Sequence, residues 1–373
     1  MKVVFCDNGL EPFLNFRGYI ACHFHKLGYD CSLIVPEYTC SNRFLDKKPR
    51  WLTLFPVEMN RDSSNPIKDI QYYRQVLSVL KSNRPNILFT YTIKPNIYAT
   101  MAAKKLGIPV VSMVAGLGYA FSGNSIIHRL GRMLYRFGLS KADKVIVLNK
   151  SNYQTLLEKK FAKKENIIIF EGGEGVDLTQ FYFHEDPYEN VRFLMVARVL
   201  YDKGYSEFVE AARIVKEKYP EIKIELLGPL AESSPMGVPE AVVRADHQSG
   251  VISYLGETDN VPEVVGLNGV VVVVVSYHEG FNRSLMEACA MGRICITSDI
   301  PGCKEIVRND YNGYLVKPKD PIMLAEAMIK VINATTEQRV KMAGNSYTLA
   351  KNVFDIKHVY KKYDNIILEV LNK

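Results

Sequence analysis

Unbroken apolar runs alternate with amphipathic segments along most of the chain. Residues 270–275 are six consecutive valines, which predict a strand buried on both faces, as in a parallel sheet. In the first half we expect strands at 2–6, 31–36, 52–57, 87–91, 110–114 and 144–148, a loop at 7–16, and helices at 17–28, 66–82, 97–107 and 125–138. This alternation predicts an α/β protein with parallel sheets.

The alternation is interrupted once, at the glycine-rich residues 171–177 and the polar residues 183–190, which are typical of an interdomain linker. It then resumes, with strands expected at 193–197, 222–227, 251–255, 270–275 and 294–298, and helices at 205–219, 285–291, 323–334 and 337–350. We therefore expect a first domain over 1–170, a linker over 171–190, a second domain over 191–352, and a cleft between the two domains. Apolar residues at helical spacing predict a last helix within 353–373.

Composition narrows the class of protein. The 373 residues are 47% hydrophobic and 23% charged, which excludes disordered and fibrous classes. The formal charge of +7 favours either simple solubility or attraction to phosphate-bearing substrates or an anionic membrane surface, and we expect no nucleic-acid partner. The seven cysteines form no Cys-x-x-Cys pair, so we expect neither a zinc nor a redox site, and a reducing, cytoplasmic compartment. The N-terminal apolar run is too short for a signal peptide, and no segment has the length of a membrane span.

Two carboxylates follow the polyvaline strand. Glu279 lies in the loop after it, and Glu287 lies on an otherwise apolar helix, where a buried charge needs a partner. One at the carboxyl end of a strand and one early in the next helix would face the crevice where open α/β sheets bind ligands. The hydroxyls of a sugar and a ribose suit such carboxylates. Taken singly, each residue also fits a solvated surface position.

Two cations follow an earlier strand. Arg198 lies at the end of strand 193–197, and Lys203 precedes helix 205–219, whose N-terminus adds positive potential. If a nucleotide sugar lies in the cleft, its diphosphate must be neutralised as it becomes the leaving group, which needs a metal or fixed cations. The sequence has no Asp-x-Asp triplet for a metal clamp, so these cations are candidates for that role, although surface cations are common.

Residues 277–291, with Glu279 and Glu287 seven residues apart, resemble the donor site of retaining glycosyltransferase family 4, which has the GT-B fold. Residues 297–307 and the Arg198 to Gly204 element extend the resemblance. It implies two Rossmann-like domains, catalytic roles for Arg198, Lys203 and Glu279, and a ribose contact for Glu287. It further implies donor contacts by Gly9, Gly228, Gly280, Phe281, Asn282, Arg283 and Ser284. It also implies that the last helix crosses back to the first domain, although a terminal helix packed on the second domain fits the pattern nearly as well.

Residues 13–17, 92–96 and 116–121 are similar to segments of bacterial polysaccharide and capsule glycosyltransferases that act on undecaprenyl-diphosphate-linked sugars. The resemblance implies acceptor contacts by Asn15, Arg17, Lys94, Gly116 and Tyr119. Two departures stand out. Gly9 is a single glycine where many relatives have a pair, and Ala115 replaces a histidine that would contact the donor sugar.

A basic segment follows at residues 126–137. Arg129, Arg132 and Arg136 recur at three- and four-residue spacing, which places them on one face of a helix. The pattern fits a solvated helix face packed on the core. It also fits an interfacial helix that binds anionic lipid headgroups or the acceptor diphosphate.

Together with the resemblance, the sequence predicts a glycosyltransferase that moves a hexose or N-acetylhexosamine from a UDP-sugar to a lipid-linked saccharide in surface polysaccharide synthesis. The resemblance implies that the anomeric configuration is retained. We expect no metal or other cofactor, and peripheral association with the inner face of the cytoplasmic membrane. A catalytically silent homologue that binds nucleotide sugar, a nucleotide-sugar epimerase of the same architecture, and a two-lobed periplasmic sugar-binding protein are the alternatives. The missing signal peptide argues against the last of these.

Overall fold

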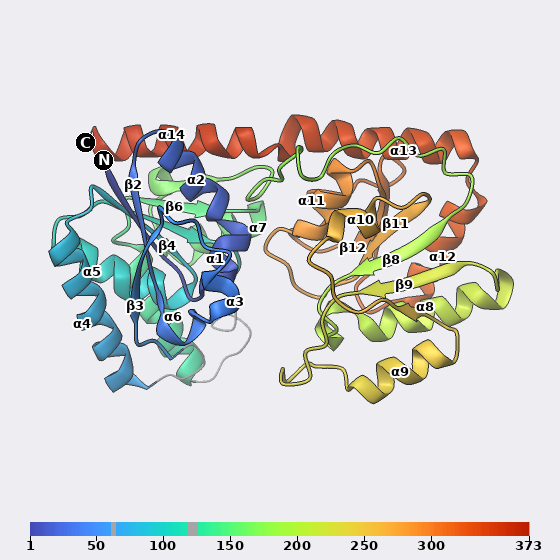
Figure 1. Cartoon of the computed structure of the whole chain (residues 1–373), viewed down its shortest axis with the longest axis horizontal. Helices are drawn as coiled ribbons and strands as arrows, with labels where there is room; N and C mark the ends of the chain where they lie inside the picture. The colour runs from blue at the N-terminus through green and yellow to red at the C-terminus, as the bar shows by residue number, and fades with distance from the viewer. Residues whose placement is uncertain (61–64, 118–125, 373) are drawn as a thin grey trace. The chain divides into compact units, whose positions relative to one another are not determined.

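The computed structural model describes residues 1–60, 65–117 and 126–372, and it divides the chain into two compact units. Unit 1 comprises Met1–Phe170 and Val359–Lys373, and unit 2 comprises Glu171–His358. Each unit is a parallel sheet with helices packed on it, so the predicted α/β class with two Rossmann-like domains is confirmed (Figure 1).

Unit 1 is built on seven parallel strands. They are β1 (Lys2–Cys6), β2 (Asp30–Pro36), β3 (Thr53–Val57), β4 (Ile87–Tyr91), β5 (Val110–Val114), β6 (Lys144–Val147) and β7 (Ile167–Ile169). The helical segments are α1 (Leu10–Phe16), α2 (Gly18–Lys26), η1 (Glu37–Thr39), α3 (Asn42–Leu45), α4 (Pro66–Asn83), η2 (Pro95–Ala99), α5 (Thr100–Lys105), α6 (Ile126–Leu139), α7 (Lys150–Glu158), η4 (Lys164–Asn166) and α14 (Ile356–Leu371). The strand order is β3-β2-β1-β4-β5-β6-β7.

The apolar strands of unit 1 are covered on both faces. Val4 of β1 lies in one cluster with Val76 of α4. Its neighbour Phe5 points to the opposite face and stacks on Phe24 of α2, with ring centroids 6.1 Å apart. Phe24 in turn meets Tyr363 of α14 edge-on at 6.1 Å. The last helix, apart from its first turn, therefore packs on unit 1 and completes the aromatic face of its sheet.

Unit 2 is built on six parallel strands. They are β8 (Arg192–Val196), β9 (Lys223–Leu227), β10 (Ser253–Tyr254), β11 (Val270–Val274), β12 (Ile294–Ser298) and β13 (Gly313–Val316). The helical segments are η5 (Tyr201–Lys203), α8 (Tyr205–Lys218), α9 (Glu240–Gln248), α10 (Val261–Val265), α11 (Arg283–Ala290), α12 (Pro321–Asn333), α13 (Thr336–Leu349) and η6 (Ala350–Phe354). The strand order is β10-β9-β8-β11-β12-β13.

The segment predicted to be a linker belongs to unit 2, so that prediction is wrong. Val176, Phe181 and Tyr188 are buried in its two hydrophobic clusters. The glycines allow close packing there: a Cβ on Gly172 would lie 2.1 Å from the carbonyl oxygen of Val353, and one on Gly173 would lie 2.4 Å from the Phe281 ring. Composition suggested a flexible connection because glycine is common both in flexible linkers and where backbones pack closely.

The loop predicted at residues 7–16 is also wrong in part, because α1 occupies Leu10–Phe16. Leu10 and Phe13 are three residues apart and both are buried, which gives this short helix an apolar face. Pro12 lies in its first turn, where the missing backbone N–H costs no helical hydrogen bond. The sequence prediction also missed α7, β7, α9, α10 and β13.

Candidate functional site

The strand order of unit 2 reverses between β8 and β11. From β8 the chain proceeds to β9 and β10 on one side, and it then returns to place β11, β12 and β13 on the other. Open parallel sheets bind ligands outside the carboxyl ends of the strands at such a reversal. The segments that follow β8 and β11 are therefore the candidate site. They carry Arg198 and Lys203 on one side and Glu279 on the other.

Lys203 and Glu279 form an ion pair at this reversal. The Nζ atom of Lys203 donates to Oε1 of Glu279 at 2.6 Å. Gly204 makes the approach possible, since a Cβ there would lie 2.5 Å from the carbonyl oxygen of Val275. The amide of Tyr277 also donates to the carbonyl oxygen of Asp202 at 3.0 Å, which fixes the two loops to each other. Two residues that are 76 positions apart in sequence thus meet as one charged group.

Arg198 and Gly228 follow the adjacent strands β8 and β9. Gly228 packs on the backbone that leads to Arg198, because a Cβ on Gly228 would lie 1.9 Å from the carbonyl oxygen of Ala197. The side chain of Arg198 is exposed and forms no hydrogen bond or ion pair with any residue that the structure describes. Its guanidinium is therefore available to an anionic ligand.

The N-terminus of α11 follows Glu279 and is held by Asn282. The Asn282 side chain accepts a hydrogen bond from the amide of Leu285 at 2.9 Å, and the Asn282 amide donates to the carbonyl oxygen of Gly302 at 2.9 Å. The structure thus gives Asn282 a capping role. Gly280 lies against Gly302, whose Cβ would be 2.5 Å from the carbonyl oxygen of Gly280. Ser284 is half-buried in the first turn of α11.

Phe281 has a packing role in unit 2. Its ring lies 6.1 Å from that of Phe354, at an interplanar angle of 71°, and it also contacts Gly173. The donor contacts expected of Phe281 and Asn282 stay predictions, and each residue has a structural function besides.

Glu287 is buried on α11 and paired within the helix. The Nε atom of Arg283, four residues earlier, donates to Oε1 of Glu287 at 2.6 Å. Burial raises the pKa of Glu287, and the nearby guanidinium lowers it in part. Because the shift is upward, the ionised carboxylate lowers the free energy of unfolding as pH rises above about 4.5, the ordinary pKa. A buried carboxylate with this cost is a candidate for ligand contact.

Two of the predicted acceptor residues, Arg17 and Lys94, lie at the corresponding strand-order reversal of unit 1, between β1 and β4. Arg17 is buried, with its guanidinium 3.8 Å from the carboxylate of Asp7 and 4.9 Å from the centroid of the Tyr91 ring. Lys94 donates to Asp69 of α4 at 2.6 Å. Both cations thus stabilise unit 1 directly, and their contact with an acceptor stays a prediction.

The other residues predicted in unit 1 differ in their surroundings. Gly9 has extended backbone and precedes α1 as its N-cap. Asn15 and Gly116 are exposed, and Tyr119 lies outside the described residues. On α6, Arg129 and Arg136 are exposed while Arg132 is half-buried. The donor contact expected of Gly9, in a different unit from Glu279, is not tested by these contacts.

Sequence reasoning missed the residues that hold the loop after β11 in place. The hydroxyl of Tyr277 donates to Oε1 of Glu207 on α8 at 2.6 Å, and the ammonium of Lys319 lies 4.6 Å from the Tyr277 ring centroid. The amide of Gly302 donates to Glu305 at 2.7 Å. Tyr277 and Glu305 lie in residues 277–291 and 297–307, the two segments that resemble the family. The resemblance therefore indicated both segments but not these contacts.

The structure shows no group of three or more His, Cys, Asp or Glu side chains suited to a metal ion within residues 1–60, 65–117 and 126–372. The expected independence of metal stays a prediction.

Comparison with known proteins gives the same two-part division. Residues 18–173 match the model of glycosyltransferase family 4, and residues 180–349 match the model of the glycosyl transferases group 1. A Campylobacter jejuni N,N'-diacetylbacillosaminyl-diphospho-undecaprenol alpha-1,3-N-acetylgalactosaminyltransferase is 29% identical over 99% of this chain and 100% of its own. An Escherichia coli UDP-Gal:alpha-D-GlcNAc-diphosphoundecaprenol alpha-1,3-galactosyltransferase is 24% identical over 89% of each chain.

Solved structures agree on the fold. A Rickettsia africae glycosyltransferase superposes with a TM-score of 0.78 at 20% identity, over 99% of this chain and 98% of its own. The Anabaena protein HepE in complex with UDP superposes with a TM-score of 0.78 at 14% identity, over 99% of this chain and 100% of its own. The two family models together span most of both units, and this chain is a glycosyltransferase of the GT-B fold, with a glycosyltransferase family 4 domain followed by a glycosyl transferases group 1 domain.

Proposed function

We propose that this glycosyltransferase moves a hexose or N-acetylhexosamine from a UDP-sugar to a lipid-linked saccharide in surface polysaccharide synthesis, with retention of the anomeric configuration. The observation that carries the proposal is the Lys203–Glu279 pair at the strand-order reversal of unit 2, where Arg198 also follows β8. The relatives from C. jejuni and E. coli are both named for diphosphoundecaprenol-linked sugars, and the second is named for UDP-Gal. These names support a lipid-linked acceptor and a UDP-sugar donor here.

In the proposed reaction, the bond between the anomeric carbon and the β-phosphate oxygen breaks, and a bond to an acceptor hydroxyl oxygen forms. Arg198 and Lys203 stabilise the negative charge that develops on the departing UDP. The departing phosphate oxygen takes the proton of the acceptor hydroxyl, so no separate base is required. Glu279 positions Lys203 through Oε1. No described residue donates a hydrogen bond to Oε2, which supports the proposal that Oε2 accepts one from a donor-sugar hydroxyl.

A binding experiment tests the donor assignment. Glu287→Ala should weaken binding of UDP by about 10- to 100-fold, because a hydrogen bond between a ribose hydroxyl and a charged group contributes roughly 1.5–3 kcal/mol. Calorimetric titration of the full chain with UDP, in the presence of EDTA, measures the change. The fold should survive, since removing Glu287 also removes a carboxylate that is costly to bury.

Glu326→Ala is the matched control, because Glu326 is an exposed carboxylate on α12 of the same unit. It should bind UDP like the unaltered protein. Equal affinity in the Glu287 variant and the control would remove the ribose assignment, and no UDP binding by the unaltered protein would remove the UDP-sugar donor.

The exposed face of α6 supports peripheral membrane association as part of the proposal. Leu130, Met133 and Phe137 are 51%, 61% and 47% exposed, which is unusual for apolar side chains on one helix. Arg129 and Arg136 are exposed beside them. Apolar side chains flanked by cations are typical of helices that lie in the interface of an anionic bilayer. Among the described helices, none is long and apolar enough to cross a membrane.

Neutralising the two exposed arginines of α6 should weaken binding to vesicles. Arg129→Gln with Arg136→Gln should lower the partition coefficient on phosphatidylglycerol-containing vesicles by about 30-fold, at roughly 1 kcal/mol per cation. Vesicle co-sedimentation measures it, and Lys341→Gln with Lys357→Gln, two exposed cations of unit 2, is the control. If both double variants bind as the unaltered protein does, α6 is an ordinary solvated helix face.

A further inference from the structure

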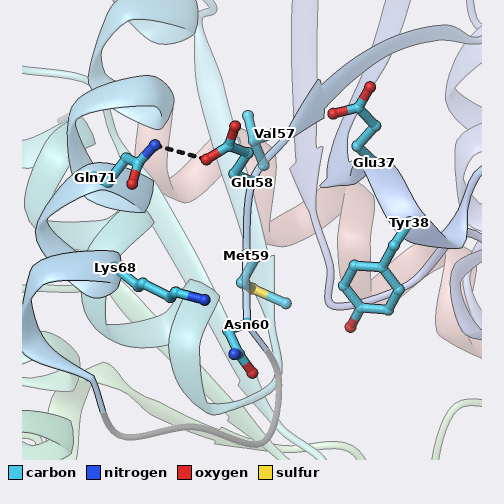
Figure 2. A pocket seen from close by; sticks show the side chains of 8 residues that line it. All are labelled: Glu37, Tyr38, Val57, Glu58, Met59, Asn60, Lys68 and Gln71. Carbon is cyan, nitrogen blue, oxygen red and sulfur yellow. Dashed lines mark hydrogen bonds between the residues drawn. The ribbon is translucent and has the colours of Figure 1, made fainter.

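A pocket of about 670 Å³ lies in unit 1. It opens where β2 and β3 end and is bounded on one side by α4 (Figure 2). A volume of this size is within the range of small-molecule sites, roughly 300–1,000 Å³. The strands β3 and β2 lie at one edge of the sheet, beside β1. None of the residues predicted from the sequence to contact donor or acceptor lines it.

On one wall of the pocket, hydrogen bonds join Glu58, the residue after β3, to α4. The Nε2 atom of Gln71 donates to Oε2 of Glu58 at 2.6 Å, as Figure 2 shows. The amide of Glu58 donates to Oε1 of Gln75 at 2.7 Å. These bonds orient the Glu58 carboxylate and the Gln71 amide, and both side chains are exposed and accessible to a ligand.

The remaining walls combine apolar and polar character. Val57 and Met59 are buried and give the pocket an apolar floor, while the ring of Tyr38 is 60% exposed across from Met59. Glu37 and Lys68 add charged groups at the sides. An aromatic ring beside fixed carboxylate and amide groups suits a ligand with one apolar face and several hydroxyls.

Charge distinguishes between ligand classes. The pocket has the carboxylates of Glu37 and Glu58 and one ammonium, that of Lys68. A phosphate group would therefore meet more negative than positive charge, which disfavours a nucleotide or a lipid diphosphate. A lipid tail would leave the polar walls without hydrogen-bond partners. A neutral or amino-substituted pyranose has neither disadvantage.

We infer that this pocket binds a pyranose ring of the saccharide acceptor, with the sugar's C–H face against Tyr38 and its hydroxyls toward Glu58 and Gln71. The inference rests on the proposed function for the identity of the acceptor, but the pocket itself can be tested without any transfer reaction. It makes Tyr38 a residue that determines which acceptor sugar is bound.

Saturation-transfer NMR on the full chain tests the inference with three probes: the methyl α-glycosides of glucose, galactose and N-acetylglucosamine. At least one should receive saturation at its ring protons. Tyr38→Ala should weaken that binding by about tenfold, and Tyr38→Phe, which retains the ring, should preserve it. Tyr182→Ala removes a similarly exposed aromatic ring from unit 2 and should change nothing.

Titration of the same samples with UDP separates the two proposals. If no glycoside binds, or Tyr38→Ala binds all three as well as the unaltered protein, while UDP still binds, the pocket inference is overturned and the proposed function stands. If UDP does not bind but a glycoside binds through Tyr38, the pocket inference stands and the proposed donor is wrong. Unchanged UDP affinity in Tyr38→Ala shows that the variant is folded.

Discussion

Arg198→Ala should lower the turnover number by about 100- to 1,000-fold and change the KM for the donor by less than tenfold. The leaving UDP gains negative charge as the anomeric bond breaks, and removal of one fixed hydrogen-bond donor at such a site has an effect of this size. The substitution should affect catalysis without affecting stability, because the Arg198 side chain is exposed and paired with no described residue. The unfolding temperature should therefore stay the same. Steady-state kinetics with the donor that the unaltered protein turns over gives both constants.

Arg244→Ala is the matched control, since Arg244 is an exposed arginine of unit 2 that pairs only with Glu240 on its own helix among the described residues. Its kinetics should not change. If Arg198→Ala raises KM as much as it lowers turnover, Arg198 acts in ground-state binding and the leaving-group role is wrong.

Lys203 is less suited to the same experiment. Its replacement by a neutral side chain would leave Glu279 without its ion-pair partner in a site that is largely closed to solvent, with the carboxylate side chain 12% exposed. A loss of activity would then mix loss of transition-state charge with loss of loop structure. Arg198→Ala therefore tests the proposed leaving-group role more directly than a substitution of Lys203 would.

Arg293→Met should lower the free energy of unfolding of unit 2 by about 3–5 kcal/mol, the cost of breaking a buried ion pair from one side. Arg293 is fully buried and donates to Oδ2 of Asp186, which also accepts from the amide of Gly269 at 2.7 Å. Because a native domain has only about 5–15 kcal/mol of stability, this is a large fraction. Thermal unfolding of the full chain followed by circular dichroism measures the change.

Adding Asp186→Asn to Arg293→Met removes the uncompensated charge and should recover part of the lost stability. A matched surface change, Arg213→Met, breaks ion pairs with Glu210 and Asp246 at a half-exposed side chain and should cost no more than about 1 kcal/mol. If Arg293→Met costs as little as Arg213→Met, the buried pair does not stabilise the segment before β8.

The strands were predictable because each is an apolar run bounded by polar residues. The strands β1, β4, β5 and β12 have the predicted bounds. The edge strands β7 and β13 were missed because they have only three and four residues. The segment at 171–190 was misread because glycine is equally common in flexible linkers and in close backbone contacts, and only the partner atoms distinguish the two.

The candidate site was predictable in its residues but not in its contacts. Sequence spacing marked Arg198, Lys203 and Glu279 separately, but the Lys203–Glu279 pair follows from β8 and β11 being neighbours in the sheet. Strand order is a property of the whole fold. The sequence did not indicate the pocket in unit 1, because Tyr38, Glu58 and Gln71 come from three separate segments with no shared motif.

The most direct test of the central claim is UDP release from a panel of UDP-hexoses and UDP-N-acetylhexosamines, measured in EDTA with and without membrane extract that contains lipid-linked acceptors. We expect release from one donor, only when the extract is present and without added metal. Release without extract, together with a changed sugar, would indicate the epimerase. UDP-sugar binding with no release in any extract would contradict the account and identify a catalytically silent homologue.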